Sequence, residues 1–88
     1  MKYQPAQIKS EVIRVLRVFC GLGDKPITGE DRLQEELGLD SVQLLSLALE
    51  VENSFQIYLG EEPDSPPRTI NDLVELVSQR LVEKEHAE

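Results

Sequence analysis

The feature that most constrains this chain is the stretch at residues 37–45, LGLDSVQLL, in which a glycine-bearing loop ends in an Asp-Ser pair. Apolar residues with helical spacing follow directly, so the stretch predicts a helix that begins at Ser41. The first backbone N–H groups of a helix have no partner within it, and the helix dipole is positive at this end. A phosphate on the Ser41 hydroxyl would therefore be stabilised by about 0.3–1 kcal/mol. The pattern indicates that Ser41 is suited to carry such a group.

Helical periodicity extends over most of the chain. The apolar positions predict helix one at about residues 6–20, helix two at about 41–54 and a last helix at about 70–83. Thr69 and Asp72 imitate a capping box at the entrance of the last helix, which we expect to fray from Lys84 onward. These patterns predict an all-α fold, a small three- to four-helix bundle that forms a single domain over residues 1–88.

Two segments break the helical pattern. Residues 21–40 are rich in glycine and predict a long loop with a short turn of helix around residues 31–36. Its expected anchors to the core are Ile27, Leu33 and Leu37. Residues 56–68 contain two adjacent prolines, which lack amide protons and disfavour helical geometry in the residue before them. We expect an irregular segment or a very short third helix there.

Composition narrows the classes of function. The 88 residues carry 17 acidic and 9 basic side chains, a net charge of −8, which disfavours nucleic acid and anionic membranes and favours partners with basic docking patches. Cys20 is the single cysteine, so it forms no intrachain disulfide and is expected to be a small buried residue in a reducing compartment. No apolar run has the length of a membrane span. We therefore expect a monomeric, soluble, cytoplasmic protein with no membrane span.

The chain resembles the acyl carrier protein family over nearly its whole length. The elements of the resemblance are the Asp40-Ser41 pair, the LQEELG lead-in at residues 33–38, the long helix from Leu44 to Phe55, and the restart TINDLV at residues 69–74. The resemblance implies that Ser41 receives 4′-phosphopantetheine from coenzyme A through a phosphopantetheinyl transferase. Acyl groups would then be carried as thioesters on this arm, with Asp40 as the motif residue at the helix entrance. Taken alone, the Asp-Ser pair would be interpreted as an ordinary helix N-cap. The matching segments around it favour attachment of 4′-phosphopantetheine at Ser41 instead.

The same resemblance implies that helix two docks partner enzymes beside the modified serine. The docking candidates are Val42, Gln43, Ser46 and Glu50. In fatty-acid carriers this helix is typically studded with acids, whereas here Asp40 is followed only by Glu50 and Glu52. Because charge complementarity governs partner choice, we expect a specialised carrier that serves acyl-loading and acyl-processing enzymes of fatty acid, polyketide or related biosynthesis. A peptidyl carrier is disfavoured, because the Gly-Gly-Asp-Ser lead-in of that group is Gly-Leu-Asp-Ser here.

Helix two carries more apolar residues than one core-facing stripe requires. In one interpretation it is the central helix of a filled core, buried on several sides. In another, the interior beside it shelters an acyl chain. The candidates for lining that interior are Leu45, Leu49, Leu59, Ile70 and Leu73. The sequence leaves both interpretations open.

Catalysis by the chain itself is not expected. A nucleophilic serine needs a base within hydrogen-bond reach, and the only histidine, His86, falls in the predicted C-terminal tail. The chemistry would belong to the cofactor and to partner enzymes. The acidic clusters lack the spacing of a calcium loop, so no metal is expected. The alternative function is an unmodified acidic helical adaptor that binds a protein partner, and modification of Ser41 distinguishes the two.

Overall fold

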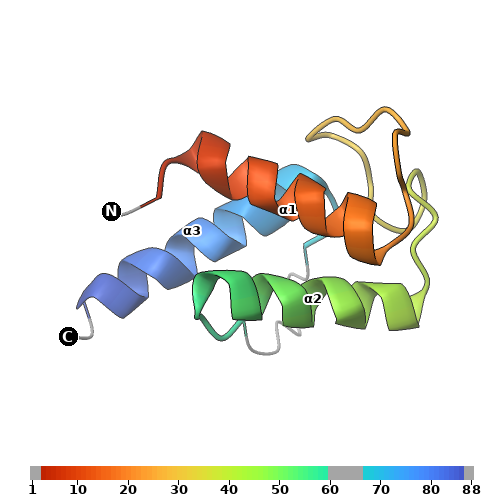
Figure 1. Cartoon of the computed structure of the whole chain (residues 1–88). Coiled ribbons are helices and arrows are strands. Elements are labelled where there is room, and N and C mark those ends of the chain that lie inside the picture. The colour runs from red at the N-terminus through yellow and green to blue at the C-terminus, as the bar shows by residue number, and fades with distance from the viewer. Residues whose placement is uncertain (1–2, 60–66, 87–88) are drawn as a thin grey trace.

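The computed structural model describes residues 3–59 and 67–86. These residues form three helices, α1 (Pro5–Phe19), α2 (Ser41–Phe55) and α3 (Ile70–His86). α1 packs against both α2 and α3. The long loop between α1 and α2 lies at the end of the bundle where α1 ends and α2 begins (Figure 1). The described residues contain no strand beyond one antiparallel bridge between Arg32 and Thr69. The predicted all-α fold, a small helix bundle, is confirmed.

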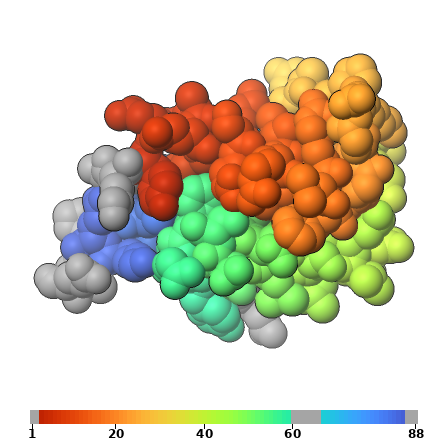
Figure 2. Space-filling model, viewed as in Figure 1, coloured from red at the N-terminus to blue at the C-terminus, as the bar shows by residue number. Residues whose placement is uncertain are grey.

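An aliphatic core fills the space between the three helices. α1 supplies a buried stripe formed by Ile8, Val12, Val15 and Leu16. The buried residues that face it are Leu47, Val51 and Phe55 of α2 and Ile70, Leu73, Val77 and Leu81 of α3. Their spacing of three and four residues places each set on one face of its helix. In the space-filling view the surface atoms of α1 and α2 lie against each other (Figure 2).

The loop between α1 and α2 is tied to the start of α3. The Leu33 N–H donates to the Arg68 carbonyl oxygen at 2.8 Å, and the Asn71 N–H donates to that of Gly29 at 2.8 Å. A Cβ at Gly29 would overlap the Asn71 side-chain amide and Lys9 Nζ, so a larger residue where the two segments cross would displace the ends of these side chains. Of the predicted anchors, Leu33 and Leu37 are buried and Ile27 is half-buried. The long loop is therefore a fixed part of the bundle.

The predicted short turn of helix in this loop is present only as a hydrogen-bonded turn. The N–H groups of Glu36 and Leu37 both donate to the Arg32 carbonyl oxygen, each at 3.1 Å. No helix is assigned over residues 31–36. Two bonds that converge on one carbonyl close a turn but do not continue into the next, which is why it stays short of a helix.

α3 begins as predicted and ends later. The Asp72 N–H donates to Thr69 Oγ1 at 3.1 Å, and the Thr69 N–H donates to Asp72 Oδ2 at 3.2 Å, which completes the predicted capping box. The helix continues to His86, beyond the predicted end at about residue 83, and the expectation that it frays from Lys84 stays a prediction. Lys84 Nζ donates to the Gln56 carbonyl oxygen at 2.8 Å, a long-range contact that holds the last turn.

The predicted irregular segment at residues 56–68 is described only at its two ends. Residues 56–59 and 67–68 are not helical, and the expectation for residues 60–66 falls outside the described residues. α2 ends where Gln56 adopts a left-handed conformation with φ of 55°, and its N–H donates to the Glu52 carbonyl oxygen. This geometry turns the chain away from the helix axis.

Candidate functional site

The entrance of α2 is a complete capping box. Asp40 has an extended backbone, and its Oδ1 accepts the Gln43 N–H at 2.8 Å. In return, Gln43 Oε1 accepts the Asp40 N–H at 3.0 Å. Asp40 is therefore the N-cap, and Ser41 is the first helical residue, exposed to solvent. Side chain and backbone together fix the position from which the Ser41 hydroxyl projects.

Gln43 also joins this entrance to the end of α1. Its Nε2 donates to the Cys20 carbonyl oxygen at 3.2 Å, and Cys20 Sγ lies 3.8 Å from the Gln43 carbonyl oxygen as a weak donor. Both the oxygen and the nitrogen of the side-chain amide of Gln43, a predicted docking residue, are thus hydrogen-bonded within the protein. Cys20 is 4% exposed, and burial raises the pKa of its thiol, which keeps the thiol protonated and unreactive.

The residues before Asp40 hold the entrance against the core. Leu37 and Leu39 are buried on either side of Gly38, whose φ of +71° is a left-handed conformation that favours glycine. The Leu39 N–H donates to the Leu33 carbonyl oxygen at 3.0 Å. Leu37 and Leu39 are thereby buried in the core, and the next two residues, Asp40 and Ser41, lie at the surface.

The other predicted docking residues differ in how far they reach the surface. Val42 is 72% exposed next to Ser41, as expected of an apolar docking contact. Ser46 and Glu50 are half-buried on α2. The structure therefore brings Val42 and Ser41 together on the outside of the helix, turns Gln43 toward α1, and leaves Ser46 and Glu50 partly covered.

The five predicted pocket residues do not line one interior. Leu59, Ile70 and Leu73 are buried, whereas Leu45 and Leu49 are 61% and 54% exposed, so the prediction that these two face the interior is wrong. The buried face of α2 is set by Leu47, Val51 and Phe55. Leu45 and Leu49 each lie two residues from a member of that set, about 200° around the helix, so they face outward.

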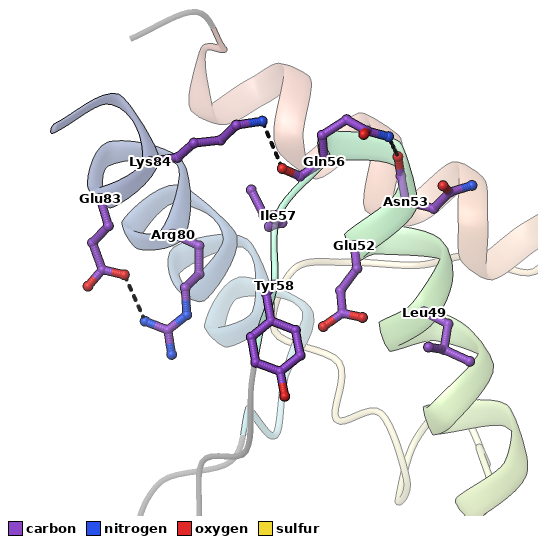
Figure 3. Close-up of a pocket in the computed structure, with 9 residues that line it drawn as sticks. All are labelled: Leu49, Glu52, Asn53, Gln56, Ile57, Tyr58, Arg80, Glu83 and Lys84. Atoms are coloured by element: carbon purple, nitrogen blue, oxygen red, sulfur yellow. Dashed lines mark hydrogen bonds and ion pairs between the residues drawn. The ribbon is translucent and has the colours of Figure 1, made fainter. Parts of the chain in front are cut away.

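A groove that the sequence did not predict lies at the other end of α2. An open groove of about 740 Å³ is lined by Leu49, Glu52, Asn53, Gln56, Ile57, Tyr58, Arg80, Glu83 and Lys84. Figure 3 shows Tyr58 between α2, which carries Leu49, and α3, which carries Arg80. Tyr58 is 75% exposed. The only sequence signal for this groove is that Arg80 and Lys84 are four residues apart, which places them on one face of α3.

No helix within residues 3–59 and 67–86 is long and apolar enough to cross a membrane. Over the same residues, no group of three or more His, Cys, Asp or Glu side chains is placed to hold a metal ion. Asp40, the acid nearest to Ser41 in sequence, is engaged in the cap by its Oδ1.

Comparison with known proteins agrees with the geometry of the α2 entrance. A family model described as "Phosphopantetheine attachment site" matches residues 7–62. The acyl carrier protein of Coprothermobacter proteolyticus is 31% identical over 78 residues, which cover 89% of this chain and 95% of that relative. The acyl carrier protein of Amoebophilus asiaticus is 29% identical over 79 residues, 90% of this chain and 99% of that relative. The chain therefore belongs to the acyl carrier protein family and is a non-catalytic carrier whose cofactor is covalently attached 4′-phosphopantetheine.

Proposed function

We propose that Ser41 is the residue that carries the 4′-phosphopantetheine arm. The observation that supports this best is the capping box, because Asp40 and Gln43 fix the start of α2 and leave Ser41 exposed as its first residue. An exposed hydroxyl is accessible to a separate transferase. A phosphodiester formed there lies at the positive end of the α2 dipole, which stabilises it by about 0.3–1 kcal/mol.

The attachment step needs only one atom of this chain. Ser41 Oγ forms a bond to the phosphorus that bears the pantetheine, the bond from that phosphorus to the nucleotide part of coenzyme A breaks, and the hydroxyl proton passes to a base of the transferase. The role of the chain is to hold the hydroxyl at the surface in one orientation. The rigid tie from Gln43 to the Cys20 carbonyl oxygen supports that orientation. The arm supplies the thiol that bears the acyl group.

The finer function that we propose is a specialised carrier of acyl thioesters. Its partners would be acyl-loading and acyl-processing enzymes of fatty acid, polyketide or related biosynthesis. The acyl carrier proteins to which the chain is similar support an acyl cargo. A single cysteine, with no intrachain disulfide, fits a reducing compartment such as the cytoplasm. The interior between the three helices is lined by buried aliphatic side chains, so an acyl chain bound there would have to separate them.

Intact mass before and after incubation with coenzyme A and a broad-specificity phosphopantetheinyl transferase tests the proposal. We expect the wild-type chain to gain one arm and Ser41→Ala to gain none. Ser10→Ala, the same change at an exposed serine of α1, is the matched control and should be modified like the wild type. Addition of the arm to Ser41→Ala would refute the assignment of the residue, and no addition to any folded variant would favour the adaptor.

A further inference from the structure

A pocket that is separate from the groove lies beside the first turns of α2. Its volume is about 580 Å³, and its lining comes from the loop before α2, from α2 itself and from the residues that lead into α3. The lining includes two arginines, a carboxylate and three apolar residues: Arg32, Arg68, Glu35, Leu33, Leu44 and Pro67. We name it the arginine pocket.

Hydrogen bonds of the main chain fix two sides of the arginine pocket relative to each other. The Leu33 N–H donates to the Arg68 carbonyl oxygen at 2.8 Å, and Arg32 forms the antiparallel bridge with Thr69. On the α3 side, Asp72 Oδ2 accepts the Arg68 N–H at 3.1 Å. Both arginine side chains therefore project from a backbone that is held in place.

The lining of the pocket is positive in a molecule that is acidic as a whole. Arg32 donates to Glu35 Oε2 at 2.5 Å, and this pair is neutral. The acids Glu36 and Asp72 accept the backbone N–H groups of Arg32 and Arg68, at 2.9 and 3.1 Å. Within residues 3–59 and 67–86, the guanidinium of Arg68 has no hydrogen bond or ion pair. The lining therefore carries one uncompensated positive charge, whereas the chain has a net charge of −8.

The arginine pocket begins within one turn of the attachment residue. Leu44 comes three residues after Ser41, about 4.5 Å further along the axis and about 60° around the helix. It is half-buried and lies between the directions of exposed Ser41 and buried Leu47. The arm is a flexible chain many bonds long. Because the pocket is so close to its point of attachment, the arm can fold back and bring the group at its end into the pocket.

We propose that the arginine pocket binds acyl cargo that has a carboxylate of its own, such as the monothioester of a short dicarboxylic acid. This inference rests on the proposed attachment at Ser41 and names the class of cargo. A guanidinium binds a carboxylate through two parallel N–H···O bonds, and Arg68 supplies such a fork. Leu33, Leu44 and Pro67 would contact the methylene groups between the carboxylate and the thioester.

The arm has an anion of its own, the phosphodiester, but its place favours the cargo as the source of the carboxylate-like ligand. The phosphodiester is bonded to Ser41 Oγ, where the unpaired N–H groups of the first turn of α2 already stabilise it. The pocket begins one turn further along, at Leu44. A group at the end of the arm can reach that place, whereas the phosphodiester is fixed at the helix entrance.

NMR of the loaded protein tests the proposal. The transferase would load the chain from glutaryl-coenzyme A with an isotope-labelled free carboxyl, and from the methyl ester of the same compound. The pH at which half of the labelled carboxyl is protonated should be lower in the wild type than in Arg68→Gln by about half a unit or more, because the ion pair favours the carboxylate. Arg32→Gln should have a smaller effect, since Arg32 is already paired with Glu35. The Leu44 methyl signals should shift with the glutaryl cargo and not with its methyl ester.

The matched control removes the same charge elsewhere. Arg14→Gln changes an exposed arginine of α1 that, like Arg32, is paired with an acid, and its loaded form should titrate like the wild type. Arg68→Gln keeps the main-chain bonds to Leu33 and to Asp72, so we expect it to fold. Its amide spectrum, compared with that of the wild type, checks this.

Each outcome separates this inference from the function on which it rests. Equal titration of the carboxyl in the wild type and Arg68→Gln would overturn the inference, and so would an equal shift of Leu44 with the methyl ester, which would show a pocket for uncharged chains. If the arm without cargo already shifted the Arg68 Nε–H signal as far as the loaded arm does, the phosphodiester would be the occupant and the inference would be wrong. Failure of the wild type to gain an arm in the mass measurement would overturn the proposed function, and the inference with it.

Discussion

The two ends of α2 are built in different ways. At the N-terminal end, Asp40 and Gln43 satisfy each other's backbone N–H groups from positions three residues apart, at 2.8 and 3.0 Å. At the C-terminal end, a closing contact comes from another helix, where Lys84 donates to the carbonyl oxygen of Gln56, 28 residues away in sequence. The first end is closed by a reciprocal local cap that Gln43 also ties to α1, whereas the second combines local bonds of Gln56 with this contact from α3.

This difference matches what each end presents to the outside. The N-terminal end holds one hydroxyl, that of Ser41, in a fixed place with bonds that a few neighbouring residues supply. The C-terminal end turns the chain at a left-handed Gln56 and opens the groove between Leu49, Tyr58 and α3. A local cap suits a residue that must keep one orientation, whereas a surface shaped by two helices can change with the partner.

The largest expected effect tests how far the N-terminal end depends on the core as well as on its cap. Leu39 is 4% exposed and immediately precedes Asp40, so Leu39→Ala should lower the free energy of unfolding by about 2–5 kcal/mol. Leu49→Ala, at an exposed leucine near the other end of α2, should change it by no more than about 0.5 kcal/mol. Urea denaturation followed by circular dichroism measures both. Equal losses in the two variants would contradict the described burial.

The next effect concerns Gln43, which links the cap to α1. Gln43→Ala removes the bond to the Asp40 N–H and the bond to the Cys20 carbonyl oxygen, so it should cost about 1–2 kcal/mol. Asp40→Ala removes the side-chain acceptor of the cap and should cost about 1 kcal/mol. A double-mutant cycle should show that the two losses are not additive, since the residues bond to each other. Additive losses would mean that the two halves of the capping box act independently.

The same contrast explains what the sequence could predict. α1 and α2 begin and end within about one residue of their predicted bounds, and α3 begins at its predicted residue, because apolar spacing and the Asp-Ser and Thr-Ile-Asn-Asp signals are local. The outward orientation of Leu45 and Leu49 was not predicted, because an excess of leucines does not say which face is covered. Phasing the helix on Leu47, Val51 and Phe55, which recur every four residues, would have placed both outside.

The groove and the late end of α3 could not be predicted for a different physical reason. Both depend on contacts between residues far apart in sequence: Arg80 Nε and the Leu59 carbonyl oxygen lie 3.3 Å apart, and Lys84 reaches Gln56. A charged tail after an apolar helix normally predicts fraying. Here Lys84 binds the Gln56 carbonyl oxygen at the end of α2, and the two residues lie close together only in the packed bundle.

A smaller effect is expected at the turn that ends α2. Gln56 has φ of 55°, a conformation that costs less for glycine than for any other residue. Gln56→Gly should raise the free energy of unfolding by about 0.5–1 kcal/mol. The loss of the hydrogen bond from Gln56 Nε2 to the Asn53 carbonyl oxygen makes this gain smaller. Gln56→Ala loses the same bond without relieving the backbone, so it is the matched control and should be destabilising. Thermal denaturation of the three proteins would show the order glycine, wild type, alanine.

The smallest expected effect is at Lys84, where the tertiary character of the C-terminal end can be tested without unfolding the protein. Lys84→Met keeps an unbranched side chain of helical propensity but removes the donor to the Gln56 carbonyl oxygen, so global stability should fall by no more than about 0.5 kcal/mol. Hydrogen exchange at the amides of the last turn of α3 should nevertheless become faster, because fraying of that turn is then opposed by fewer contacts. Lys25→Met, in the loop between α1 and α2, should leave those amides unchanged. If exchange at the end of α3 were the same in Lys84→Met and the wild type, the last turn would be held by the helix itself, and the two ends of α2 would differ less than their bonding indicates.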